Sequence, residues 1–155
     1  TDELSVTHTQ LLQTLDQSLD TADVLLIAAH RWDEPVPLTR AWCLYECFRA
    51  VMLKKMIKIG FPQKEAVRFA SAVQSFEANV EEVALNQVDI GKAKATMDTD
   101  LQMIRASIAN SVGDAEFNRV LRTKLMAHLV YCAVTTDSSS LADRRKTPKS
   151  AVAPA

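Results

Sequence analysis

The segment PLTRAWCLYECFRA, Pro37 to Ala50, places a Trp, a Cys, a Tyr and a Glu within five residues, downstream of an apolar run and a proline-containing loop. Its apolar residues recur at helical spacing, which predicts a helix from Arg40 to about Lys54 with one buried face. The residues expected on that face are Ala41, Leu44, Phe48 and Met52. We expect Thr39 to cap the helix, and two lysines near its C-terminal end to interact favourably with the helix dipole.

The run ADVLLIAA, Ala22 to Ala29, precedes this helix and is apolar throughout except for its single Asp. A short apolar run of this kind is typical of a strand buried on both faces, as in parallel sheets covered by helices. The intervening segment HRWDEPVPLT is predicted to be a loop, because Pro35 and Pro37 lack amide donors and disfavour helical geometry in the residues before them. A second short strand is expected in KMIKIGFP, Lys55 to Pro62. This order of elements predicts an α/β fold.

Further helices are expected on both sides of this unit. Leucines at helical spacing predict an amphipathic helix over residues 3–20. A helix that begins near Pro62 carries apolar residues at alternating spacings of four and three, which predicts one narrow apolar seam. The seam consists of Phe69, Val73, Phe76, Val80 and Val83. The remaining expected elements are an edge-like strand around residues 87–90 and two helices, around Leu101–Val112 and Phe117–Leu129, that are separated at Gly113.

The composition fits one domain. The chain has 155 residues, 48% hydrophobic and 24% charged, which are ordinary proportions for a soluble protein with its own core. We assign residues 1–136 to the α/β domain and residues 137–155, which are poor in large apolar side chains, to a flexible basic tail. The net charge of -1 gives no general attraction to nucleic acid or anionic lipid. The longest apolar runs fall far short of the ~20 residues that a membrane helix needs.

The cysteine count bears on location. Three cysteines, an odd number, do not indicate a disulfide framework, and no signal peptide is visible. We therefore expect an intracellular protein, either cytoplasmic or organellar. The chain opens at Thr1 without Met, which fits processing, truncation or an unseen N-terminal part.

Trp42 and Glu46 are the first candidate functional pair. They are four residues apart and share a helix face, so a carboxylate beside an indole at the sheet edge is one expectation. Desolvation there would raise the pKa of Glu46 and suit acid–base chemistry. The alternative is that Trp42 belongs to the core and that Glu46 pairs with Arg40, Arg49 or a backbone amide.

The cysteines and histidines are weaker candidates. Cys43 and Cys47 are four apart, but no nearby His or Cys completes a four-ligand metal set, and parallel side chains on one helix disfavour a disulfide. They are interpreted as small buried hydrophobes. His30 follows the first strand at the carboxyl end, where α/β sheets bind ligands, and is either a base or anion binder or a loop residue. His8 and His128 are interpreted as structural, and glycine-rich phosphate loops and a serine elbow are absent.

Four segments of the chain resemble a domain of algal and protist proteins that often stands beside tetratricopeptide repeats, in kinesin-light-chain-like proteins. The segments are ADVLLIAAHRWDEPVPLTRAWCLYE, IGFPQKEAVRFASAV, QVDIGKAKATMDTDLQMIRASI and GDAEFNRVLRTKLMAHL, which cover most of Thr21 to Leu129. The shared pattern is an apolar strand, a loop with Trp and Pro, and then Leu, Thr or Ser, Arg, Ala, Trp, Cys, Leu, Trp or Tyr, and Glu. The signature residues in this chain are Trp32, Pro35, Arg40, Trp42, Cys43 and Glu46.

That pattern is in turn similar to the Toll/interleukin receptor (TIR) domain, in which a segment with Trp, Cys and Glu opens a helix after a central strand. In TIR enzymes this Glu acts in the cleavage of NAD, and the resemblance implies Glu46 as the matching residue. A TIR-like fold has two further strands and a helix before the helix at residues 3–20, and this chain lacks them. The resemblance therefore implies a truncated TIR-like domain with a parallel sheet of two to three strands, about five helices and one open edge.

These features predict a non-catalytic protein-interaction or structural module, an accessory subunit that docks on a larger assembly. The open strand edge and the apolar seam are the expected contacts, and a protein partner covers the edge. This reading assigns no catalytic residue, cofactor, metal, nucleic acid or membrane-spanning segment. One alternative is a TIR-like NAD hydrolase that uses Glu46, and another is a signalling adaptor that assembles through TIR-like surfaces.

Overall fold

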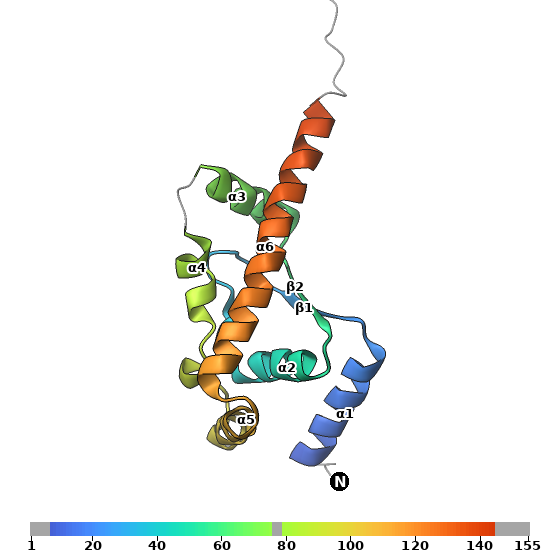
Figure 1. The fold of residues 1–155 in the computed structure, drawn as a ribbon, viewed down its shortest axis with the longest axis vertical. Coiled ribbons are helices and arrows are strands. Elements are labelled where there is room, and N and C mark those ends of the chain that lie inside the picture. The colour runs from blue at the N-terminus through green and yellow to red at the C-terminus, as the bar shows by residue number, and fades with distance from the viewer. Residues whose placement is uncertain (1–6, 76–78, 145–155) are drawn as a thin grey trace, which may run out of the picture.

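The computed structural model describes residues 7–75 and 79–144, in which a two-stranded parallel sheet is packed against helices (Figure 1). The elements, with η for 3-10 helices, are α1 (His8–Thr21), β1 (Val24–Ala28), η1 (Val36–Thr39), α2 (Ala41–Met52), β2 (Met56–Gly60), α3 (Gln63–Gln74), α4 (Val80–Val83), η2 (Leu85–Gln87), η3 (Ile90–Lys92), α5 (Asp98–Ser111) and α6 (Asp114–Arg144). The predicted helix-rich α/β class is confirmed.

β1 and β2 are joined through η1 and α2, and their register runs from Val24 opposite Met56 to Ala28 opposite Gly60. The buried face of α2 contains Ala41, Leu44 and Phe48 as predicted, together with Tyr45, Cys47 and Ala50. Met52 was expected on that face but is 45% exposed. The expected cap at Thr39 is also wrong, because Thr39 belongs to η1 and its hydroxyl donates to the carbonyl of Val36 (2.8 Å).

The prediction that β1 is buried on both faces is wrong. Ile27 is 7% exposed, whereas Leu26 is 62% exposed, and the same alternation continues in β2, where Ile57 is buried and Met56 is not. The buried residues belong to the main hydrophobic core, and α2 contacts both strands. The described helices therefore cover one face of the sheet and leave the other open.

α6 closes the outer edge of β2. The ring nitrogen Nε2 of His128 lies 3.0 Å from the carbonyl oxygen of Ile59, so a helix side chain satisfies a strand-edge group. The helix begins after Gly113, whose φ of 83° makes it the predicted break. It continues to Arg144, past residue 136 where we expected the domain to end, while residues 145–155 lie outside the described part (Figure 1).

The predicted strand around residues 87–90 is wrong, because this segment forms the 3-10 turns η2 and η3. Side chains of α6 bond its backbone in place of a neighbouring strand. The guanidinium of Arg122 donates to the carbonyl of Val88 through Nε (3.1 Å) and Nη2 (2.7 Å), and the amide of Ile90 donates to Asn118 Oδ1 (3.1 Å). Val88 and Ile90 are nevertheless fully buried, so the apolar pattern reports burial rather than a strand.

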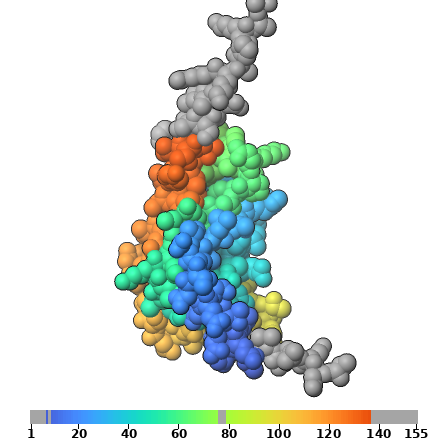
Figure 2. All heavy atoms as spheres, turned by 90° about the vertical axis from the view of Figure 1, so that its right-hand side faces the viewer, coloured from blue at the N-terminus to red at the C-terminus, as the bar shows by residue number. Residues whose placement is uncertain are grey.

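The helix predicted for residues 3–20 is present as α1, within the described residues. Thr7 and Gln10 form a capping box at its start. Leu19 is 4% exposed and belongs to the core, and Leu12 and Leu15 pack against it. Arg49 of α2 forms a two-pronged ion pair with Asp16 (2.7 and 2.8 Å). α1 thus lies on the surface over α2, as the blue atoms in Figure 2 show.

Candidate functional site at the open edge of β1

The outer edge of β1 carries free backbone groups. The amide of Met56 donates to the carbonyl of Asp23 (3.2 Å), and the amide of Ala29 donates to the carbonyl of Gly60 (3.0 Å), so Asp23 and Ala29 face β2. Because backbone polar groups alternate in direction along a strand, Val24, Leu26 and Ala28 direct their amides and carbonyls away from β2. No hydrogen bond joins these outward groups to any residue in the described ranges.

Two adjoining hollows follow this edge. The first has a volume of about 150 Å³ and is lined by Leu25, Leu26, Ile27, Ala28, Pro37, Cys43 and Glu46. The second has a volume of about 340 Å³ and is lined by Ala28, His30, Arg31, Glu34, Val36, Pro37 and Arg40. Since they share Ala28 and Pro37, we treat them as one groove and call it the β1 edge groove.

Glu46 lines this groove from α2 and is half-buried. Burial raises the pKa of its carboxyl, and the positive charge of Arg40 opposes that shift. Of the partners considered from the sequence, Arg49 is paired with Asp16 instead, and Glu46 has no hydrogen bond or ion pair with a described residue. A carboxyl in this state is suited either to proton transfer or to hydrogen bonding with a bound segment.

Trp42 does not line the groove. Its indole Nε1 donates to Asp100 Oδ2 (2.9 Å), and its ring contacts Tyr45 edge-on with centroids 6.0 Å apart. Trp42 therefore joins α2 to α5. We expected this indole to lie beside Glu46 at the sheet edge, but the structure places it against Tyr45 and Asp100. Trp42 packs against the core, as the alternative interpretation proposed.

The two α2 cysteines are poor nucleophiles. Cys43 lines the groove, where burial, followed by the charge of Glu46, raises the pKa of its thiol. Cys47 is 1% exposed, and burial raises the pKa of its thiol strongly. Because the thiolate is the reactive form, both cysteines behave as small apolar side chains. No group of three or more His, Cys, Asp and Glu side chains in the described ranges is placed to hold a metal ion.

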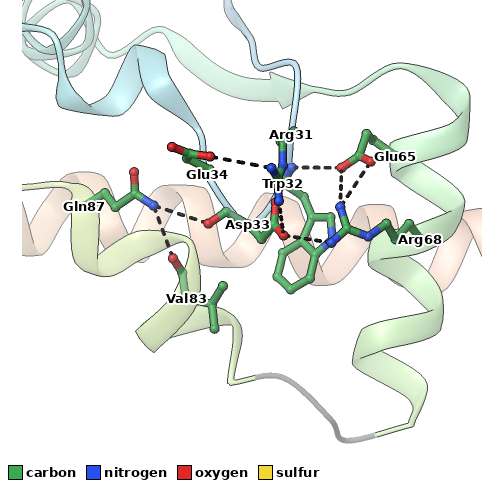
Figure 3. A network of polar contacts seen from close by, with 8 residues as sticks. All are labelled: Arg31, Trp32, Asp33, Glu34, Glu65, Arg68, Val83 and Gln87. Carbon is green, nitrogen blue, oxygen red and sulfur yellow. Dashed lines mark hydrogen bonds and ion pairs between the residues drawn. The ribbon is translucent and has the colours of Figure 1, made fainter.

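A charged network fixes the loop after β1, beside the groove (Figure 3). Asp33 accepts from Arg31 Nε (3.0 Å) and Nη2 (2.9 Å) and from Arg68 Nη2 of α3 (2.8 Å). Hydrogen bonding from Arg31, with a further contribution from Arg68, lowers the pKa of Asp33 to about 2, although desolvation opposes the shift. The side-chain nitrogen Nε2 of Gln87 also donates to the backbone carbonyl of Asp33 (3.3 Å), so the loop is held by α3 and η2 together.

The signature residues of this loop serve packing. Trp32 is 5% exposed, and its ring packs on Phe69 of α3 with centroids 5.4 Å apart. Its backbone amide donates to Glu65 Oε2 (3.4 Å), and Pro35 is buried. Asp33, Glu65 and Arg68 were not singled out from the sequence. Glu65 and Arg68 are three residues apart, so the sequence could have suggested their ion pair. Asp33 and Arg68 are thirty-five positions apart, and no local pattern in the sequence indicates that they are in contact.

The predicted apolar seam is not one helix face. α3 ends at Gln74 and α4 begins at Val80, so the single helix expected from Pro62 to Val83 is wrong. Phe69 is 2% exposed and belongs to the core, Val73 and Val80 are partly buried against it, and Val83 is 36% exposed. Phe76 lies outside the described residues. A partner could not reach Phe69 without unfolding this region, so we do not place the docking surface on the seam.

His30 lies at the carboxyl end of β1, as predicted. It is exposed and lines both the groove and a further hollow of about 480 Å³ on the open face of the sheet. That hollow is lined by Leu26, Ala28, Ala29, His30, Gly60, Phe61 and Pro62. The open edge and the open face of β1 therefore meet at His30.

Within residues 7–75 and 79–144, every helix is too short or too polar to cross a membrane. Comparison of the chain with protein-family models, with curated proteins and with solved structures gave no match.

Proposed function

We propose that this chain is a non-catalytic protein-interaction module, an accessory subunit that binds an extended segment of a partner protein at the open edge of β1. The observation that carries the proposal is the row of outward amides and carbonyls on Val24, Leu26 and Ala28, which lies beside a preformed groove. Unpaired strand edges bind extended segments readily, because backbone hydrogen bonds supply affinity and neighbouring pockets supply selectivity.

Side chains on the open face add to this surface. Leu26 is 62% exposed, Met56 is 56% exposed and Val24 is 37% exposed. In the register Met56 lies opposite Val24, and Lys58 lies opposite Leu26. Burying apolar area of this kind contributes about 25 cal/mol per Å² removed from water. A bound segment would therefore gain hydrophobic contacts on the same strand whose backbone it pairs with.

A proline substitution tests the proposal. The amide of Leu26 points away from β2, so Leu26→Pro removes a donor from the outer edge without removing a bond of the β1–β2 ladder. We expect the wild-type protein to migrate with a larger assembly in a native extract of its source cells, and Leu26→Pro to migrate as a free species. The control Leu26→Ala keeps the backbone donor and should retain most of the association. Unchanged association of a folded Leu26→Pro protein would contradict the proposal.

A second candidate function is a TIR-like NAD hydrolase that uses Glu46. The observation that favours it is the half-buried Glu46 carboxyl with a raised pKa in the β1 edge groove. This candidate predicts that Glu46→Gln abolishes NAD turnover while leaving the circular dichroism spectrum and thermal stability intact. Absence of NAD turnover by the wild-type protein in its native assembly would eliminate it.

A further inference from the structure

We infer that the extended segment that pairs with β1 is β1 of a second copy of this chain, which runs antiparallel to it about a two-fold axis at Leu26. The inference rests on the proposed function, because it names the partner of the same strand edge. It follows from the register of the outward groups, the distribution of charge along β1 and the closed edge of β2.

The register of the outward groups is self-complementary. Val24, Leu26 and Ala28 are symmetric about Leu26, so a two-fold axis places Val24 opposite Ala28 of the second copy and Leu26 opposite Leu26. In an antiparallel ladder, two residues form a hydrogen-bonded pair only if the amide and carbonyl of each point toward the other strand. Val24, Leu26 and Ala28 meet this requirement in both copies. Each copy would contribute three donors and three acceptors. A shift by one residue would oppose outward groups to groups already bonded to β2.

The side chains of these three residues would lie on one face of the joined sheet. Val24, Leu26 and Ala28 are all exposed on the open face, where Met56 of β2 adjoins Val24. Pairing about Leu26 would bring the two Leu26 side chains together at the centre of the joined sheet, where each is flanked by Lys58 of its own β2, while Val24 of each copy would lie between Met56 and the other copy's Ala28. Cross-strand apolar pairs stabilise sheets, and the 62% exposure of Leu26 would fall.

The charges favour the antiparallel direction. Asp20 and Asp23 are exposed at the amino end of β1, where Lys55 Nζ donates to the backbone carbonyl of Asp20 (2.9 Å) and neither carboxylate has an ion pair with a described residue. His30 and Arg40 line the groove at the carboxyl end. Arg31 and Glu34 also lie at that end, where Arg31 is engaged by Asp33 and Glu34. Arg40 has no ion pair with a described residue. Antiparallel pairing would set the acidic end of each β1 near the basic side chains of the other copy.

The contact of α6 with β2 limits self-pairing through the sheet edge to two copies. α6 packs against β2, and His128 contacts the carbonyl of Ile59 at the edge of that strand, so among the described residues β1 is the strand that we expect to pair. An isologous two-fold contact then gives a four-stranded sheet in the order β2–β1–β1–β2, and no further copy can add to it. Strands of five residues bury less than the roughly 1,200–2,000 Å² of a standard protein interface. The dimer is therefore expected to be concentration-dependent.

Analytical ultracentrifugation over a range of micromolar concentrations tests the inference. The wild-type protein should pass from monomer to dimer as concentration rises, and no species larger than a dimer should form. Leu26→Arg should stay monomeric, because the two-fold axis would place two arginines opposite each other. Val67→Arg is the matched control, since Val67 on α3 is 50% exposed and does not line the groove. Both variants alter exposed positions and should keep the wild-type circular dichroism spectrum.

Disulfide trapping tests the register. Opposed residues in a hydrogen-bonded antiparallel pair have Cα atoms ~5.5 Å apart, within the range that a disulfide spans. Under mild oxidation Leu26→Cys should give a covalent dimer, whereas Val67→Cys and the wild-type protein, which share the native cysteines, should give little. Dimers trapped equally by all three proteins would overturn the proposed register.

The failure of this inference is distinguishable from failure of the proposed function. A wild-type protein that stays monomeric at every concentration overturns the pairing of two copies. If Leu26→Pro nevertheless leaves the larger assembly, the edge binds a different protein and the proposed function stands. If the wild-type protein is monomeric and a folded Leu26→Pro stays in the assembly, both proposals are wrong.

Discussion

Replacement of Asp33 by Asn measures how strongly the charged network holds the loop beside the β1 edge groove. Asp33 accepts hydrogen bonds from Arg31 and Arg68, which lie on the loop and on α3 (Figure 3). Asn keeps the size and one acceptor oxygen but removes the negative charge. We expect the variant to fold and to be less stable at neutral pH.

The magnitude follows from the pKa of Asp33. The carboxyl titrates at about 2 in the folded protein against a reference value of 3.8, a difference of 1.8 that corresponds to at most about 2.4 kcal/mol. The side chains of Arg31 and Arg68 are 49% and 50% exposed, so solvent screens the interaction, and we expect about 1 kcal/mol. Because the folded-state pKa is lowered, this stabilisation is complete above pH 3.8 and is lost as the pH falls through about 2.

Urea denaturation of the wild-type and Asp33→Asn proteins between neutral pH and about pH 3 provides the measurement. The difference in the free energy of unfolding should be constant near neutral pH and fall to about half near pH 3, and added salt should reduce it. Asp20→Asn, at an exposed position of α1, controls for the loss of one carboxylate. A difference that is independent of both pH and salt would refute the ionic origin of the stabilisation.

Three further substitutions test contacts that position the fold. Trp42→Phe removes the donor to Asp100 and should lower the free energy of unfolding by about 1–2 kcal/mol in urea denaturation; an unchanged midpoint would contradict a role for this bond in joining α2 to α5. Phe69→Ala empties a buried site against Trp32 and should cost about 3–5 kcal/mol, so a cost below about 1 kcal/mol would show that the site is not tightly packed. Gly113→Ala should cost about 1–2 kcal/mol in thermal unfolding, because φ is +83° and no atom lies within 4 Å of an added Cβ; Gly113→Asn should cost less, and equal costs would point to another cause.

The local pattern was sufficient to predict α2 and the two strands. The repeat of apolar residues from Ala41 to Phe48 has helical spacing, and the prolines at 35 and 37 stop a helix from starting earlier. These effects act over a few residues along the chain, so a single sequence records them. The motif also led to Glu46, which the structure places in the groove.

The contacts between residues distant in the sequence could not be predicted from local patterns. Asp33 and Arg68 are thirty-five positions apart, and Trp42 and Asp100 are fifty-eight apart. The same limit explains the error at residues 87–90, where Arg122 and Asn118 of α6 bond the backbone of an apolar segment that has no neighbouring strand.

The sequence by itself determined both strands, the loop between them and most of the helices, because backbone preference and apolar periodicity are properties of adjacent residues. It did not determine the break after Gln74 or the 3-10 turns at residues 85–92. Only the tertiary structure decided which surfaces of those elements are covered. β1 is apolar on both sides, yet Ile27 is buried and Leu26 is exposed, since the described helices pack on one face of the sheet. The closed edge of β2 and the open edge of β1 likewise depend on where α6 lies, and burial of this kind is set by elements distant in the sequence.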